Sequence, residues 1–251
     1  MPRPVPIDIT LRKSATLTRH ELDEIWAVTD RYVETDREVY EAKLRALPEV
    51  GLWRARSGAL VGLVSLDVYR VAWEGRSRVI FFTSSVVIDE RYRGRNLVLR
   101  TGLRAFFREK LRRPWESGFW LFDTFSYKSY LILSRNLGTF WPRRDHLAPP
   151  DVASFVDFLA RRRYGDAWSA STGVVRRSGD KRLRGATAPI TDARRRDADV
   201  RFFESANPGH DQGDMLVCLV PLSLSNLSGA VLRAFVRPLA SRPAPQTDSG
   251  G

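Results

Sequence analysis

An apolar, β-rich run of the chain breaks at residues 91–96 into a basic turn with one glycine, Arg-Tyr-Arg-Gly-Arg-Asn. The stretch after it carries apolar residues at helical spacing, so the turn stands between a strand and a helix. Such a turn leaves several backbone N–H groups without intrahelical partners and adds the positive end of the helix dipole behind them. Gly94 lets an anion approach the main chain without meeting a Cβ. These features predict a phosphate cradle.

Three arginines surround this glycine, at positions 91, 93 and 95. Arg91, Arg93 and Arg95 supply formal charge that backbone amides lack, and their spacing suits an extended polyphosphate better than a single anion. We therefore predict that the turn binds a pyrophosphate group. The alternative interpretation is a solvated basic turn without a ligand.

The chain as a whole is basic. It has 251 residues with 41 Lys and Arg against 29 Asp and Glu, a formal net charge of +12. This charge favours phosphorylated or otherwise anionic partners, including nucleic acid, acidic proteins and anionic membranes, but does not choose among them.

Cysteine and histidine usage excludes several kinds of site. Cys218 is the only cysteine, so neither an internal disulfide nor a cysteine-based zinc site is expected, and a cytoplasmic location fits best. The three histidines are scattered, which argues against a Ser/His/Asp arrangement, and we expect no metal site. The N-terminal residues are too proline-rich for a secretory signal, and no stretch reads as a clean membrane span.

Hydrophobic periodicity predicts the elements that position the turn. A Thr18-x-x-Glu21 capping box should open the first helix, and a stripe from Leu99 to Leu111 indicates a helix after the turn. Glycine-bearing gaps at residues 57–58 and 74–76 favour antiparallel hairpins. The expected strands are residues 5–11, 51–56, 59–71, 79–88, 118–125 and 139–142, and two further helices are residues 37–46 and 127–136.

The composition changes at about residue 147. Residues 152–164 read as a helix, whereas residues 165–200 are polar and arginine-rich, which predicts a long irregular insertion. Residues 161–201 hold twelve Lys and Arg against five Asp and Glu, a basic segment that is a solvated surface or a docking face for an anionic partner. Further on, residues 214–222 read as a buried strand and residues 226–239 as a helix. We thus predict a domain at 1–146, an α/β extension at 147–240 of uncertain role and a disordered tail at 241–251.

The element order of residues 1 to about 145 resembles the GNAT superfamily of N-acyltransferases. That family places Gln or Arg, two residues, Gly, one residue and Gly or Ala between its fourth strand and third helix, and residues 91–96 match except for Asn96 at the last position. The resemblance implies an α/β fold with a mixed, splayed sheet. It also implies acyl-CoA as donor, with the pyrophosphate on Gly94 and the neighbouring amides and the pantetheine arm along Val86, Val87 and Ile88.

The resemblance also suggests where proton transfer takes place. Many relatives keep a tyrosine general acid at the position that is Ser134 here, and Tyr130 lies one turn earlier on the same side of the helix. The ammonium proton of an acceptor amine needs a route as well, for which Asp123 and Glu90 are candidates. A packed aromatic at Tyr130 and a capping carboxylate at Asp123 are the structural alternatives.

The sequence therefore predicts an enzyme that transfers an acyl group from acyl-CoA directly to an amine. One alternative is a transferase for longer lipid chains that takes its donor from acyl carrier protein. Another is a non-catalytic basic module that binds nucleic acid or an anionic membrane, although the basic segment lacks the interleaved aromatics that stack on bases.

Overall fold

The computed structural model describes residues 6–177, 181–184, 189–223 and 225–228. Within these residues, eight strands form one sheet in the order β1-β3-β4-β5-β6-β10-β8-β7, and β2 pairs separately with β9. The strands are β1 Ile7–Lys13, β2 Val33–Thr35, β3 Glu49–Ala55, β4 Leu60–Trp73, β5 Arg76–Ile88, β6 Ser117–Thr124, β7 Trp168–Ser169, β8 Val174–Val175, β9 Lys181–Leu183 and β10 Met215–Pro221.

The sheet is mixed, as expected. β1 pairs antiparallel with β3, β3 with β4, and β4 with β5. The last two pairs are hairpins, which confirms the hairpins expected at the two glycine-bearing gaps. β5 and β6 are parallel, because the helix between them returns the chain to the same end of the sheet, and β10 is antiparallel to β6. The large, mostly antiparallel sheet with flanking helices confirms the predicted fold class.

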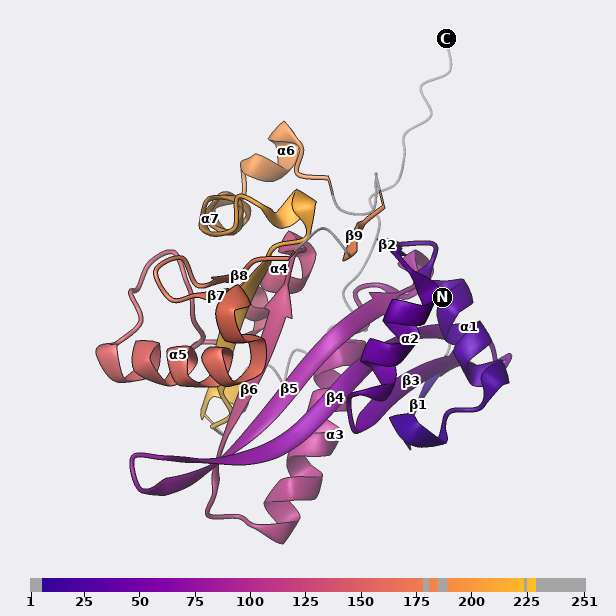
Figure 1. The fold of residues 1–251 in the computed structure, drawn as a ribbon, viewed down its shortest axis with the longest axis horizontal. Helices are drawn as coiled ribbons and strands as arrows, with labels where there is room; N and C mark the ends of the chain where they lie inside the picture. The colour runs from indigo at the N-terminus through magenta and orange to yellow at the C-terminus, as the bar shows by residue number, and fades with distance from the viewer. Residues whose placement is uncertain (1–5, 178–180, 185–188, 224, 229–251) are drawn as a thin grey trace.

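Helices cover both faces of this sheet (Figure 1). Side chains alternate along β5, so Ile80 and Phe82 pack with α5 while Phe81, between them, packs with α3. The helices α1 and α2 share the face of α5, and α4 shares the face of α3. The helices are α1 Arg19–Thr29, α2 Arg37–Arg45, α3 Leu97–Arg112, α4 Tyr127–Asn136, α5 Pro150–Tyr164, α6 Asp192–Arg195 and α7 Ala198–Ala206.

Several helix ends follow from the sequence. The predicted capping box is present, because Thr18 Oγ1 accepts from the Glu21 N–H at 3.2 Å and Glu21 accepts from the Thr18 N–H at 2.9 Å. These two bonds satisfy donors that would otherwise be unpaired at the start of α1. In the described residues, no helix combines the length and apolar character that a membrane crossing requires.

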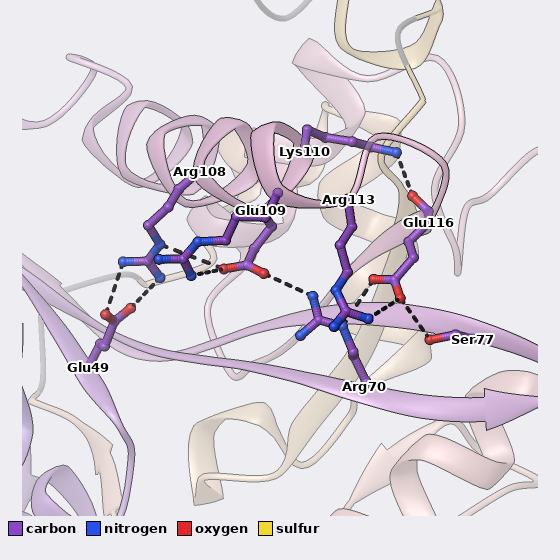
Figure 2. Close-up of polar contacts among 9 residues, drawn as sticks. Glu49, Arg70, Ser77, Arg108, Glu109, Lys110, Arg113 and Glu116 are labelled. Atoms are coloured by element: carbon purple, nitrogen blue, oxygen red, sulfur yellow. Dashed lines mark hydrogen bonds and ion pairs between the residues drawn. The ribbon is translucent and has the colours of Figure 1, made fainter.

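An ion-pair network fixes the direction of α3 (Figure 2). Arg108 of α3 donates to Glu49 of β3 at 3.0 and 2.8 Å, and Arg70 of β4 donates to Glu109 at 3.1 Å and to Glu116 at 3.0 Å. Glu109 and Glu116 are 8% and 7% exposed, so the arginines are needed to compensate buried charge. The network ties the C-terminal half of α3 to the sheet and thereby holds its N-terminus at the end of β5.

The structure differs from the sequence expectations after β6. Residues 139–142 form only an isolated bridge, Trp141 with Leu219, because Pro142 cannot donate in a ladder. The region 165–200 was expected to be irregular, yet it contains β7, β8, β9 and α6. β10 lies beside β6, so the sheet runs across residue 146 into the predicted extension. The predicted tail at 241–251 and most of the helix at 226–239 lie outside the described residues.

Candidate active site

β5 and β6 part at one end of the sheet. Their parallel pairing runs from Arg78 opposite Ser117 to Thr83 opposite Phe122, after which β5 continues to Ile88 without β6 as a partner. On its other edge β5 pairs with β4 through a bulge, because Ser84 pairs with Ser65 but Val87 pairs with Leu63. This opening between two parallel strands is the predicted splay.

The bulge distorts β5 beside the opening. Ser85 has a φ of 51°, in the left-handed region, and Val86 is 36% exposed. Val87 and Ile88 pair with β4 on one edge, while the opposite edge of β5 faces the opening. Main-chain groups on a free strand edge can pair with an extended ligand. The three residues predicted to bind the pantetheine arm therefore lie at the opening.

The predicted phosphate turn follows β5 directly. Residues 90–92 form a short 3₁₀ turn, Gly94 has a φ of 79°, and Asn96 is left-handed with φ 53° and ψ 33°. Asn is the best non-glycine residue for that conformation, so its presence in place of a small residue fits the local backbone. A Cβ added at Gly94 would meet nothing within 4 Å, so the space in front of this glycine is open.

The amides of the turn divide into two groups. The N–H groups of Arg91, Tyr92 and Arg93 are occupied, because they donate to the side chain of Asp89, to the Asp89 carbonyl and to the Glu90 carbonyl. In the described part of the chain, the N–H groups of Gly94, Asn96, Leu97, Val98 and Leu99 have no hydrogen-bond acceptor. A nest of amides without an acceptor therefore starts at Gly94 and continues into the first turn of α3, the geometry that suits an anion.

The three arginines of the turn are held in different ways. Arg91 donates to Asp89 through Nε and Nη2, both at 3.0 Å. Its guanidinium therefore stabilises the conformation of the turn. The guanidinium of Arg93 lies 4.9 Å from the centre of the Tyr32 ring, and its Nε donates to the Ile88 carbonyl at 3.3 Å. Arg95 lies over the Tyr92 ring at 5.1 Å.

Tyr32, between α1 and β2, connects this turn to the later part of the chain. Its hydroxyl accepts a hydrogen bond from the Glu90 N–H at 3.1 Å, and its carbonyl accepts from the Arg184 N–H at 3.0 Å. Arg184 follows β9, whose pairing with β2 brings residues from the predicted extension to the turn after β5. Sequence reasoning missed Tyr32, because nothing local in the sequence indicates so distant a contact.

Arg100 is a second residue that sequence reasoning missed. It lies in the first turns of α3, where its N–H donates to the Asn96 carbonyl at 2.9 Å. Burial and the nearby Arg104 lower the pKa of its guanidinium from the ordinary value. Among the described residues it has no ion-pair partner, which leaves a partly buried cation close to the nest. Its helical position after Asn96 is the signal that could have identified it.

The structure separates the two predicted carboxylates. Asp123 is on β6, one residue beyond the last β5–β6 pair, and its side chain is 2% exposed. Ser84 of β5 donates to Asp123 Oδ1 at 3.4 Å, so Asp123 lies at the root of the opening. Glu90 is exposed on the turn, and no contact joins it to Asp123 within the part of the chain that is described. The two therefore do not form a pair.

The two predicted proton donors lie on α4. Tyr130 is fully buried against Phe140, Phe202 and Phe203, and its hydroxyl donates to the Pro142 carbonyl at 3.1 Å. Burial raises the pKa of this hydroxyl well above its ordinary value. The Ser134 hydroxyl is buried without a hydrogen-bond partner among the described residues. Tyr130 thus acts as a packed tyrosine in this structure, which is the structural alternative for this position.

No family model matches the chain. No curated protein matches it either. A probable N-acyltransferase from Enterococcus faecalis V583 has a TM-score of 0.35 at 15% identity, over 49% of this chain and 31% of that one, so this chain spans about a third of it. The ribosomal-protein-S18-alanine N-acetyltransferase of Escherichia coli has a TM-score of 0.39 at 11% identity, over 86% and 96%.

A third solved structure is a complex with CoA. It is the GNAT family N-acetyltransferase YhbS from Escherichia coli in complex with CoA, with a TM-score of 0.33 at 17% identity over 47% of this chain and 63% of that one. The solved structures that this chain is similar to thus include GNAT-family and other N-acetyltransferases and a probable N-acyltransferase.

Proposed function

We propose that this protein is a GNAT-type N-acyltransferase that passes an acyl group from acyl-CoA to an amine. The observation that carries the proposal is the open nest from Gly94 to Leu99, which directly follows a bulged strand at the splayed end of the sheet. A nest at a helix N-terminus attracts phosphate, and the adjacent free strand edge suits an extended amide-bearing arm. CoA has a pyrophosphate for the nest, joined directly to an amide-bearing pantetheine arm for the strand edge.

The residues of the turn have separate roles in donor binding. The amides of Gly94, Asn96 and Leu97 bind the pyrophosphate, while Arg93 and Arg100 add charge beside them. Asp89 and Arg91 hold the turn in its conformation. Val86 and the neighbouring main chain of β5 pair with the pantetheine arm.

Asp123 accepts the proton of the acceptor ammonium in this proposal. Acyl-CoA supplies the acyl group as a thioester, whose carbon gains a C–N bond and loses its C–S bond. Asp123 takes one proton from the ammonium and later releases it to solvent, and the thiolate takes the second nitrogen-bound proton through water. A thiolate is a good leaving group, so a dedicated proton donor on α4 is not required.

Donor binding and turnover test this function separately. Isothermal titration with CoA, acetyl-CoA and decanoyl-CoA measures binding, and release of free thiol from each acyl-CoA measures turnover with a lysine peptide, spermidine and an aminoglycoside. We expect CoA binding in the micromolar range and thiol release with at least one amine. Absence of binding by all three compounds, with the protein folded by circular dichroism, would refute the proposal.

A further inference from the structure

The carboxylate of Asp123 is contacted by side chains from three other segments. Ser84 of β5 donates to Oδ1 at 3.4 Å, and Tyr164, the last residue of α5, donates to Oδ2 at 2.9 Å. Arg177, just after β8, places Nη2 3.7 Å from the same Oδ2. Tyr164 and Arg177 both belong to the region after residue 146. The predicted extension therefore reaches the root of the splay.

Tyr164 is a hydrogen-bond donor at neutral pH. Burial, followed by the negative charge of Asp123, raises the pKa of its hydroxyl well above the ordinary value of 10. The proton accordingly stays on the tyrosine oxygen and points at the carboxylate. A hydrogen bond to the charged form of a carboxylate favours that form, so the bond from Tyr164 contributes to stabilising the carboxylate of Asp123.

The two oxygens of Asp123 have unequal surroundings. Oδ2 has Tyr164 and Arg177, whereas Oδ1 has only the long contact with Ser84 among the described residues. The main chain of Arg177 is held in place, because its backbone N–H donates to Asp214 Oδ1 at 2.9 Å. A carboxylate held by one oxygen can accept a further hydrogen bond through the other. Oδ1 is therefore the oxygen with unused hydrogen-bond accepting capacity.

We propose that Tyr164 is a positioning residue that holds Asp123 through Oδ2 and so presents Oδ1 to the acceptor ammonium. This inference depends on the proposed acyltransferase function and adds to it that α5 and the segment after β8 complete the active site. Tyr164 forms no bond to substrate. Its contribution is the orientation and ionisation of the carboxylate that accepts the proton.

Other groups around Asp123 set its electrostatic surroundings. Arg163 of α5 lies 3.3 Å from the centre of the Phe82 ring and pairs with Asp67 of β4 at 3.3 Å. On β10, the buried thiol of Cys218 has its pKa raised by burial and by the charge of Asp123, so it stays neutral. Among the described residues, Arg177 is therefore the cation in direct contact with Asp123. Ser84 and Tyr164 contact the same carboxylate as neutral hydrogen-bond donors.

The substitution Tyr164→Phe tests the inference, because it removes the donor and keeps the ring. We expect kcat/KM for the best amine of the panel to fall about 10-fold, while the Kd for CoA stays within twofold of wild type. Loss of a donor to the carboxylate favours its protonated form, so the acid limb of the pH profile of kcat/KM should move to higher pH.

Tyr40→Phe is the matched control. Tyr40 of α2 is 2% exposed, and its hydroxyl accepts from Thr29 at 3.2 Å, so its substitution removes a buried tyrosine oxygen that does not contact Asp123. Its pH profile should match wild type. If Tyr164→Phe has a wild-type pH profile and kcat/KM and loses only stability, the positioning role is wrong although the acyltransferase function stands.

A second variant covers the case in which Tyr164→Phe does not fold. Arg177→Met removes the other group at Oδ2, and it should move the acid limb in the same direction; an unmoved limb overturns the inference. Wild-type protein that binds no CoA and releases no thiol refutes the acyltransferase function itself and this inference with it. The two failures are therefore distinguishable.

Discussion

Asp89 accepts three hydrogen bonds from Arg91, one from its N–H at 3.1 Å and two from its guanidinium at 3.0 Å. Arg31 of the loop after α1 donates to the same carboxylate at 2.9 Å. Asp89 is 2% exposed, so one buried acid organises the turn that precedes the nest. The guanidinium of Arg91 is consequently paired with a protein carboxylate and stabilises the turn, even without a ligand.

This arrangement predicts a specific pH dependence. The hydrogen bonds from Arg91 lower the pKa of Asp89 to about 2, against about 3.9 in an unfolded chain. A lowered pKa contributes stability that is fully present above the unfolded value and is lost as the pH falls through about 2. At pH 7 we expect Asp89→Asn to lower the free energy of unfolding by about 1–3 kcal/mol.

Urea unfolding of both proteins from pH 7 to pH 3 measures this effect. The stability difference between wild type and Asp89→Asn should be constant down to about pH 5 and should narrow below it. Other carboxylates titrate in both proteins and cancel in the difference. A gap that is unchanged at pH 3 would show that the ionisation of Asp89 does not stabilise the turn.

The nest makes a second prediction, for Gly94. Trp at this position would place an indole in the open space in front of the free amides, so the Kd for CoA should rise at least about 10-fold. Gly75 is a matched control, because it also has a positive φ, 69° against 79°, and no atom within 4 Å of an added Cβ. Gly75→Trp carries the same backbone strain at the tip of the β4–β5 hairpin.

Comparison of the two glycine variants separates strain from blocking. Both should lose a similar stability of about 1–2 kcal/mol, because a side chain with φ near +70° is strained. Only Gly94→Trp should lose donor binding in isothermal titration. Equal CoA affinity in the two variants would place the donor elsewhere on the protein.

Substitution of Arg100 should have opposite effects on CoA binding and on stability. Arg100→Gln removes a partly buried cation beside Arg104, so the free energy of unfolding should be equal to or above that of wild type. The Kd for CoA should rise about 5- to 20-fold through loss of a charge-assisted contact to phosphate. Arg104→Gln is the control one turn later, because Arg104 donates to the Ile9 carbonyl at 2.5 Å. The control should lose stability and keep donor affinity, and the reverse pattern would contradict the role of Arg100.

Local patterns in the sequence predicted the N-terminal part of the fold. The β-rich runs of β4 and β5, glycine in the hairpin gaps and the Thr18 capping box are each local signals over a few residues, so they can be read from a single chain. The helix expected at 127–136 is α4 with the same bounds. The splay itself came from the resemblance in element order, and the structure confirms it.

The parts that could not be predicted depend on contacts between distant residues. β9 has three residues and pairs with β2, about 150 positions earlier. Glu34 of β2 and Asp30, just before it, form ion pairs with Arg182 and Arg184. Likewise, nothing local indicates that Tyr164 meets Asp123. The sequence predicts three arginines around Gly94, but it does not show where each side chain points. In the structure the guanidinium of Arg91 turns back to Asp89.

Tyr130 and Ser134 provide the last prediction, on proton transfer. If the hydroxyl of Tyr130 serves only the Pro142 carbonyl, Tyr130→Phe should lower the free energy of unfolding by about 0.5–1.5 kcal/mol and leave kcat within twofold of wild type. Ser134→Ala removes a buried hydroxyl without a partner among the described residues, so it should be neutral or slightly stabilising. Urea unfolding and thiol release measure both effects. A loss of kcat above 10-fold in Tyr130→Phe, together with loss of the basic limb of its pH profile, would instead identify Tyr130 as the proton donor to the thiolate.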